Sequence, residues 1–101
     1  MNEAELRRSL ASSDAEGRKR LLREAIRTHA ATLLSLNSID DDSNLLELGL
    51  NSLSAIEVTK RLMIITDMEI PLVTIVDHPT PAQLANHIAE EYTQAHEGVP
   101  S

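Results

Sequence analysis

The chain of 101 residues contains no cysteine, no phenylalanine and no tryptophan, and Tyr92 is its single tyrosine. The lack of cysteine excludes disulfides and thiolate metal sites and fits a reducing cytoplasm. No apolar run approaches the roughly 18 residues of a membrane-spanning helix, and the first residues lack the apolar block of a signal peptide. We therefore expect one cytoplasmic domain without a membrane partner, whose core is aliphatic because apolar residues still make up 42% of the chain.

Basic residues are scarce after residue 27. Residues 28–101 hold only Lys60 and Arg61 against eleven acids, whereas residues 1–27 hold seven bases and five acids. An acidic body argues against nucleic acid as a partner, since phosphates require Lys and Arg contacts. The acids suit docking onto basic surfaces of partner proteins, although keeping a small domain in solution is an equally physical reason for them.

The first half of the chain reads as helix followed by a long loop. A capping-box pattern predicts a helix that starts near Asp14, and its apolar spacing continues to about Leu36. Residues 1–12 are interpreted as a linker or a short extra helix, since Leu6 and Leu10 can share one helical face.

Residues 37–51 form an unusually long connection that is rich in Asp and Asn. We expect the acids at positions 40–42 to face solvent, Asn44 to cap a short turn, and Leu45 and Leu48 to point inward. Part of this loop has the spacing of a calcium-binding loop, but Leu45 replaces its required Gly and Asn51 its bidentate Glu, so no metal site is predicted.

Ser52 opens the next apolar-periodic stretch, which predicts a helix from Ser52 to about Ile65. A serine at a helix N-terminus commonly serves as an N-cap. The same position suits a phosphate ester, because free N–H groups and the positive end of the helix dipole favour anions there. The expected core face consists of Leu53, Ile56, Thr59 and Met63, flanked by Ala55 and Leu62.

The last third ends that helix and begins two more. Pro71 stops the preceding helix, and the apolar run 72–76 is interpreted as a short irregular helix because no partner strand exists for it. A second capping-box pattern predicts a final helix from Pro81 to about Thr93, followed by a flexible tail or linker over residues 94–101.

The sequence around Ser52 resembles the attachment motif of acyl carrier protein domains, especially those of modular polyketide synthases. The matching stretches are Leu48-Gly49-Leu50-Asn51-Ser52-Leu53, Ala55-Ile56-Glu57, Arg61-Leu62, Ile70-Pro71 and Ile75-Val76-Asp77-His78-Pro79-Thr80-Pro81. Together they span roughly residues 15 to 93. The clear departure is Asn51, since the family usually has Asp there, and it removes one negative charge beside the serine.

This resemblance implies an all-α fold: a small four-helix bundle, with three longer helices and one short one, a long first crossover loop, and residues 13–93 as the carrier domain. It implies that a separate phosphopantetheinyl transferase attaches 4'-phosphopantetheine from coenzyme A to Ser52, and that the arm carries acyl groups as thioesters between a ketosynthase, an acyltransferase and other synthase domains. The implied partner-docking residues are Leu50, Asn51, Leu53, Ser54, Glu57, Val58 and Arg61, with Leu50 and Val58 exposed. Candidate residues for an acyl cleft are Ile56, Ile70, Ile75 and Leu84. For each of them, the alternative interpretation is an ordinary core residue.

The residues themselves indicate a carrier or interaction module and not an enzyme. A nucleophile elbow would need Gly at positions 50 and 54, where Leu50 and Ser54 stand. Two alternatives remain at this point. One is a peptidyl carrier domain of a nonribosomal peptide synthetase, against which Leu50 argues; the other is a helical adaptor in which Ser52 is only a cap.

Overall fold

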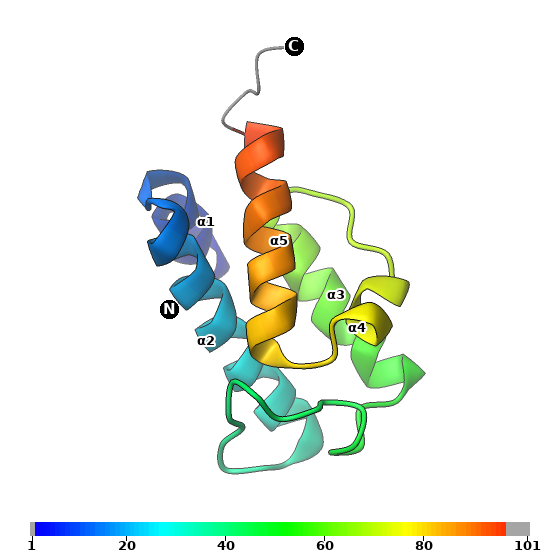
Figure 1. Ribbon diagram of the computed structural model, residues 1–101. Helices are drawn as coiled ribbons and strands as arrows, with labels where there is room; N and C mark the ends of the chain where they lie inside the picture. Colours follow the sequence, from blue (N-terminus) through cyan, green and yellow to red (C-terminus); the bar gives the residue numbers. More distant parts are fainter. Residues whose placement is uncertain (1, 97–101) are drawn as a thin grey trace.

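The computed structural model describes residues 2–96, whose regular secondary structure consists entirely of helices (Figure 1). The helices are α1 Glu3–Ser12, α2 Ala15–Leu34, α3 Ser52–Thr66, α4 Val73–Asp77 and α5 Pro81–His96. The predicted small helical bundle with a long first crossover is confirmed, and α1 adds a fifth helix to it. None of the helices within residues 2–96 has the length and apolar character that crossing a bilayer demands.

The helix ends follow their capping residues. The Asp14 side chain caps α2 by accepting a hydrogen bond from the Gly17 amide at 2.7 Å. The helix ends at Leu34, two residues earlier than expected, where Ser35 turns into the left-handed conformation with a φ of 57°. At the other end of the chain, α5 continues past the predicted limit, so residues 94–96 are its last turn. The rest of the expected tail, residues 97–101, lies outside the described residues.

The bundle is organised around the antiparallel pair α2 and α5, which make the most extensive interhelical contact. In Figure 1, α2 runs down toward the crossover loop, whereas α3 and α5 run upward from that end. The core is almost entirely aliphatic, as the composition predicts. Its fully buried large apolar side chains are Leu10, Leu22, Ile26, Leu45, Val58, Leu62, Ile75, Leu84 and Ile88.

The first helix is part of this core and is not a linker. Leu6 and Leu10 of α1 are buried, and α1 packs on both α3 and α2. The buried Arg18 side chain fixes the end of α1, since its Nε donates to the Leu10 carbonyl at 3.0 Å. The same guanidinium lies 4.9 Å from the centre of the Tyr92 ring and donates to Thr93 Oγ1 at 3.1 Å. One side chain of α2 therefore joins α1 to α5.

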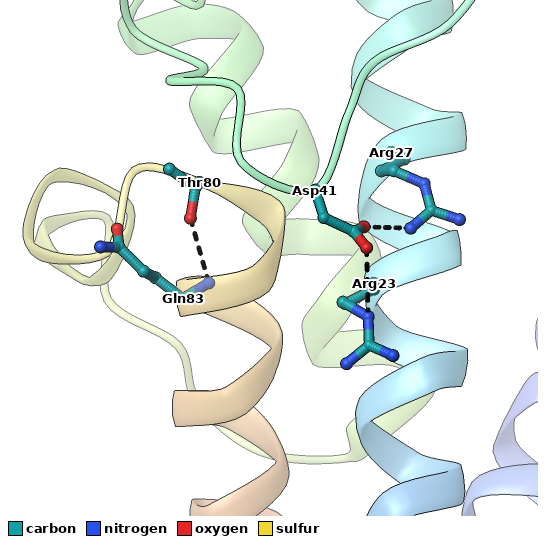
Figure 2. Close-up of polar contacts among 5 residues, drawn as sticks. All are labelled: Arg23, Arg27, Asp41, Thr80 and Gln83. Carbon is teal, nitrogen blue, oxygen red and sulfur yellow. Dashed lines mark hydrogen bonds and ion pairs between the residues drawn. The ribbon is translucent and has the colours of Figure 1, made fainter.

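The crossover loop is tied to α2 by Asp41. This carboxylate is paired with Arg23, 3.6 Å away, and with Arg27, which donates a hydrogen bond to it (Figure 2). The expectation that all three acids at positions 40–42 face solvent is therefore wrong at Asp41, which is half-buried, whereas its two neighbours are exposed. The sequence pattern missed it because the two arginines lie on a helix that is distant along the chain.

Backbone hydrogen bonds attach the same loop to the start of α5. The Ala82 amide donates to the Asp41 carbonyl at 3.0 Å, and the Leu45 amide donates to the Pro79 carbonyl at 2.8 Å. Leu45 is fully buried, as expected. The loop that leads to Ser52 is thus attached to both α2 and the start of α5. The position of the serine therefore depends on these contacts with helices that are distant along the chain.

Candidate functional site

Ser52 is the first residue of α3, and it is exposed. The N-cap is its neighbour Asn51, whose side-chain oxygen accepts from the Ser54 amide at 3.0 Å. The Ser54 hydroxyl in return accepts from the Asn51 amide at 2.9 Å, which completes a capping box. Capping thus does not use the Ser52 hydroxyl, and no hydrogen bond of that hydroxyl occurs within residues 2–96. A serine that faces solvent and does not cap the helix is available for modification.

The turn before Ser52 presents it outward. Asn44 Oδ1 accepts from the amides of Leu46 and Glu47 at 2.9 and 3.1 Å, which forms the expected capped turn. Gly49 has a φ of +114°, a conformation that a residue with a Cβ rarely adopts. Leu50 then turns into the core, where only 5% of it is exposed. The expectation of an exposed Leu50 is wrong, because this leucine anchors the loop directly beneath the serine.

The same turn also corrects the prediction for Leu48, which was expected to point inward. It is 41% exposed, and only Leu45 of the pair reaches the core. The reason is geometric: a short turn places Leu45 toward the α5 start, to which its amide is bonded, and directs Leu48 away.

The start of α3 is electropositive. The capping box occupies the amides of Asn51 and Ser54, while the amides of Ser52 and Leu53 have no acceptor within the described part of the chain. The first turn contains no acidic residue, and Asn51 is neutral. Two free N–H groups and the positive end of a 15-residue helix favour an anion at the Ser52 side chain. The site thus fits a phosphate ester on that hydroxyl.

The buried face of α3 agrees only in part with the prediction, since Ala55, Thr59 and Leu62 are buried as expected but other residues are not. Val58, expected to be exposed for docking, is 1% exposed and belongs to the core. Leu53 and Ile56, expected to belong to the core, are exposed, and Leu53 is 72% accessible. The buried face consists of Ala55, Val58, Thr59, Leu62, Ile65 and Thr66. The apolar pattern misled because both faces of this helix carry large aliphatic residues.

Arg61 was expected among the residues that dock a partner. It is instead half-buried, and its Nη1 lies 3.5 Å from Glu3 Oε2 of α1. Glu57 pairs with Lys60, at 3.7 Å. Burial lowers the pKa of His29, on the adjacent α2, and the positive charge of Arg61 lowers that pKa further. Arg61 therefore belongs to the contact between α1 and the rest of the bundle.

A groove of about 300 Å³ opens beside the serine. It lies between the turn before Ser52, the start of α3, and α4, and it is mainly apolar. Its lining consists of Leu46, Leu50, Asn51, Ser52, Ala55, Leu72, Ile75 and Val76.

The four predicted cleft residues have different positions. Ile75 lines the groove, whereas Ile56 is exposed and Ile70 and Leu84 are buried in the core. Sequence reasoning missed the contribution of α4 to the groove. The signal that could have revealed it is the presence of three exposed aliphatic residues within residues 72–76, since a short helix that only faces solvent does not need them.

These features together define a class of protein. The fold presents a serine hydroxyl to solvent at the N-terminus of a helix, beside an apolar groove. No His, Asp or Glu side chain within residues 2–96 is hydrogen-bonded to that hydroxyl. This arrangement suits a helical carrier domain that another enzyme modifies.

The comparisons agree with this class. Residues 24–88 match the family model described as phosphopantetheine attachment site, and the chain belongs to that family. Members of this family hold 4'-phosphopantetheine covalently, and family membership therefore supports a carrier domain over a helical adaptor. The matched range includes Ser52, the groove and both predicted motifs.

Similar curated proteins are components of polyketide synthases. The spectinabilin polyketide synthase system protein NorA' of Streptomyces orinoci is 39% identical over 89 residues, which cover 85% of this chain and 2% of that protein. The pikromycin polyketide synthase component PikAIII of Streptomyces venezuelae is 37% identical over 87 residues, which cover 83% of this chain and 6% of that protein. The chain thus spans only a few per cent of the length of these relatives.

Two solved structures share the fold. An A1-type acyl carrier protein domain from module 5 of MLSA1 is 31% identical with a TM-score of 0.73, and the match covers 84% of this chain and 88% of that one. BlmI, a type-II acyl carrier protein from Streptomyces verticillus, is 26% identical with a TM-score of 0.70, and covers 75% of this chain and 92% of its own. The fold is therefore that of an acyl carrier protein.

Proposed function

We propose that Ser52 carries the 4'-phosphopantetheine arm and that the chain is an acyl carrier domain of a modular polyketide synthase. The exposed, unbonded Ser52 hydroxyl at the start of α3 is the observation that carries this proposal. The polyketide synthase relatives support the acyl cargo over the aminoacyl cargo of a peptidyl carrier. The arm supplies the terminal thiol that this cysteine-free chain lacks, and holds the cargo as a thioester.

The chain's own contribution is presentation. The free amides of Ser52 and Leu53 would bind the phosphate oxygens, and the neutral Asn51 would not repel them. The groove beside Ser52 offers an apolar surface along which an arm or a short acyl chain can lie. The domain performs no catalysis in this proposal. It acts in the cytoplasm, where its coenzyme A donor is available.

The partners proposed are the phosphopantetheinyl transferase, the ketosynthase, the acyltransferase and the other domains of the synthase. Their contact surface is the exposed face around the serine, which includes Asn51, Leu53 and Glu57. Leu53 is the prominent apolar residue of that surface. The buried Leu50 and Val58 shape this surface from below and do not touch the partner.

The test is intact-protein mass spectrometry after incubation with coenzyme A and a broad-specificity phosphopantetheinyl transferase. We expect a gain of one phosphopantetheine group, absent in Ser52→Ala and retained in the neighbouring variant Ser54→Ala. No gain in the parent protein, or a gain that persists in Ser52→Ala, would refute the proposal. Loading the modified protein with malonyl and with aminoacyl donors then distinguishes the acyl carrier from the peptidyl carrier.

A further inference from the structure

A second groove lies on the outer side of the molecule, between α1 and the C-terminal half of α3. It has a volume of about 470 Å³, and its lining consists of Arg7, Lys60, Met63, Ile64 and Asp67. Ile64 is 47% exposed, although it is a large aliphatic residue, and forms an apolar floor with Met63. This groove is separate from the one beside Ser52, with which it shares no residue.

The groove has a basic rim on an acidic molecule. Residues 28–101 contain only two bases, and one of them, Lys60, stands here opposite Arg7 of α1. Lys60 pairs with Glu57 at 3.7 Å, but both side chains are largely exposed, so this pair is weak and easily exchanged. Arg7 is exposed, and no ion pair of its guanidinium occurs within residues 2–96. The rim can therefore accept carboxylates from outside, against the opposing charges of Asp67 in the lining and Glu57 beside Lys60.

The position along α3 connects this groove to the attachment site. Ile64 lies twelve residues after Ser52, or about 18 Å along the helix axis. The exposed face of α3 runs from the Ser52 end to this groove through Leu53, Glu57, Lys60 and Ile64, the last two of which line the groove. A partner enzyme that approaches an arm on Ser52 along α3 thus reaches the α1–α3 groove as well.

We propose that the α1–α3 groove is a second docking site, and that it binds a segment of the partner enzyme in which acidic residues flank an exposed apolar one. Carboxylates of that segment pair with Arg7 and Lys60, while its apolar side chain covers Ile64. The identity of the partner as a synthase enzyme rests on the proposed function of Ser52. Because α1 lies outside the matched residues 24–88, one of the five lining residues, Arg7, comes from a part of the chain that the family model does not cover.

The test uses the apo protein and a fluorescein-labelled 12-residue peptide, Leu-Glu-Glu-Leu repeated three times, in fluorescence anisotropy and NMR titrations. We expect chemical-shift changes centred on Arg7, Met63 and Ile64, and binding that weakens with salt. Peptides with Lys in place of Glu, or Ser in place of Leu, should bind at least several-fold more weakly. Shift changes confined to the Ser52 end of α3 would overturn the proposal.

The chain offers a matched control for charge. Arg7→Glu should weaken peptide binding about fivefold, the effect of losing one exposed ion pair. Arg8→Glu makes the same charge change on a neighbouring exposed residue that does not line the groove, and should have little effect. Equal weakening by the two variants would show a general charge effect and refute the site. Ser52→Ala should bind the peptide normally, so that failure of this proposal is distinct from failure of the attachment proposal.

Discussion

The side chains of Asn51 and Ser54 each accept a hydrogen bond from the other residue's backbone amide, at 3.0 and 2.9 Å. This reciprocal cap starts α3 without using the residue between them that the proposed function requires. The consequence is a division of labour: Asn51 and Ser54 hold the helix, and Ser52 remains free to be modified.

This division predicts the effect of Asn51→Ala. Loss of the cap should lower the free energy of unfolding by about 1 kcal/mol in urea denaturation. Asn51→Asp retains a capping oxygen and should remain as stable as the parent protein. Ser52→Ala should also leave stability almost unchanged. A larger loss in Ser52→Ala than in Asn51→Ala would mean that the serine, and not its neighbour, caps the helix.

The ion pairs of Asp41 with Arg23 and Arg27 predict a difference between adjacent acids. Asp41→Ala should lower the free energy of unfolding by about 1 kcal/mol, a modest value because all three side chains are partly exposed. The exposed Asp42 makes a matched control, and Asp42→Ala should change stability by less than about 0.5 kcal/mol. Urea unfolding measures both. Equal effects would contradict the role of Asp41 in holding the crossover loop.

The observed faces of α3 predict opposite results for two aliphatic residues. Val58→Ala should lower the free energy of unfolding by about 2 kcal/mol, because it leaves a cavity in the core. Leu53→Ala should be nearly neutral in the same denaturation assay, since Leu53 is mostly exposed. In transfer assays from the phosphopantetheinyl transferase, Leu53→Ala should raise the KM for the carrier. The reverse order of stabilities would restore the original assignment of faces.

His29 predicts a loss of stability toward acid. Its folded pKa is lowered below 6.5 by burial and then by Arg61, with the Glu57 carbonyl and the carboxylates of Glu57 and Glu3 acting in the opposite direction. Between the unfolded value, about 6.5, and the lower folded value, the unfolded chain binds more protons, so stability falls as pH falls through this window. Above it, the full contribution is present.

Urea midpoints measured between about pH 5 and 8 test this, with His29→Gln as the comparison. In the His29→Gln variant, the urea midpoint should fall less between about pH 8 and pH 5 than in the parent protein. At about pH 8, where both states hold a neutral His29, the variant should differ from the parent protein only through the change in packing. An unchanged pH dependence in His29→Gln would show that other groups cause the decline.

Local sequence signals predicted the helices well because each depends on neighbouring residues. Asp14, Thr80 and Pro81 marked helix starts near where the structure has them, and Asn44 capped the expected turn. The attachment motif singled out a serine that the structure leaves exposed.

What could not be predicted depends on contacts distant along the chain. The burial of Asp41 follows from two arginines of α2, and the position of Arg61 follows from Glu3 of α1. The face of α3 was misassigned because its outward side also carries large aliphatic residues, so periodicity alone gave no unique answer. The burial of Val58 instead of Leu53 depends on tertiary packing, in which α3 contacts both α1 and α2.

The bond from Arg18 to the Leu10 carbonyl, beneath the ring of Tyr92, has a practical consequence for engineering. The domain could be fused to another synthase by cutting the chain at residue 24, where the family match begins. This cut would divide α2 and remove α1 with its buried leucines. The severed graft would keep the modifiable serine but lose the side chain that clamps three helices together. A transplant that starts ahead of Asn2 would carry its own scaffold intact.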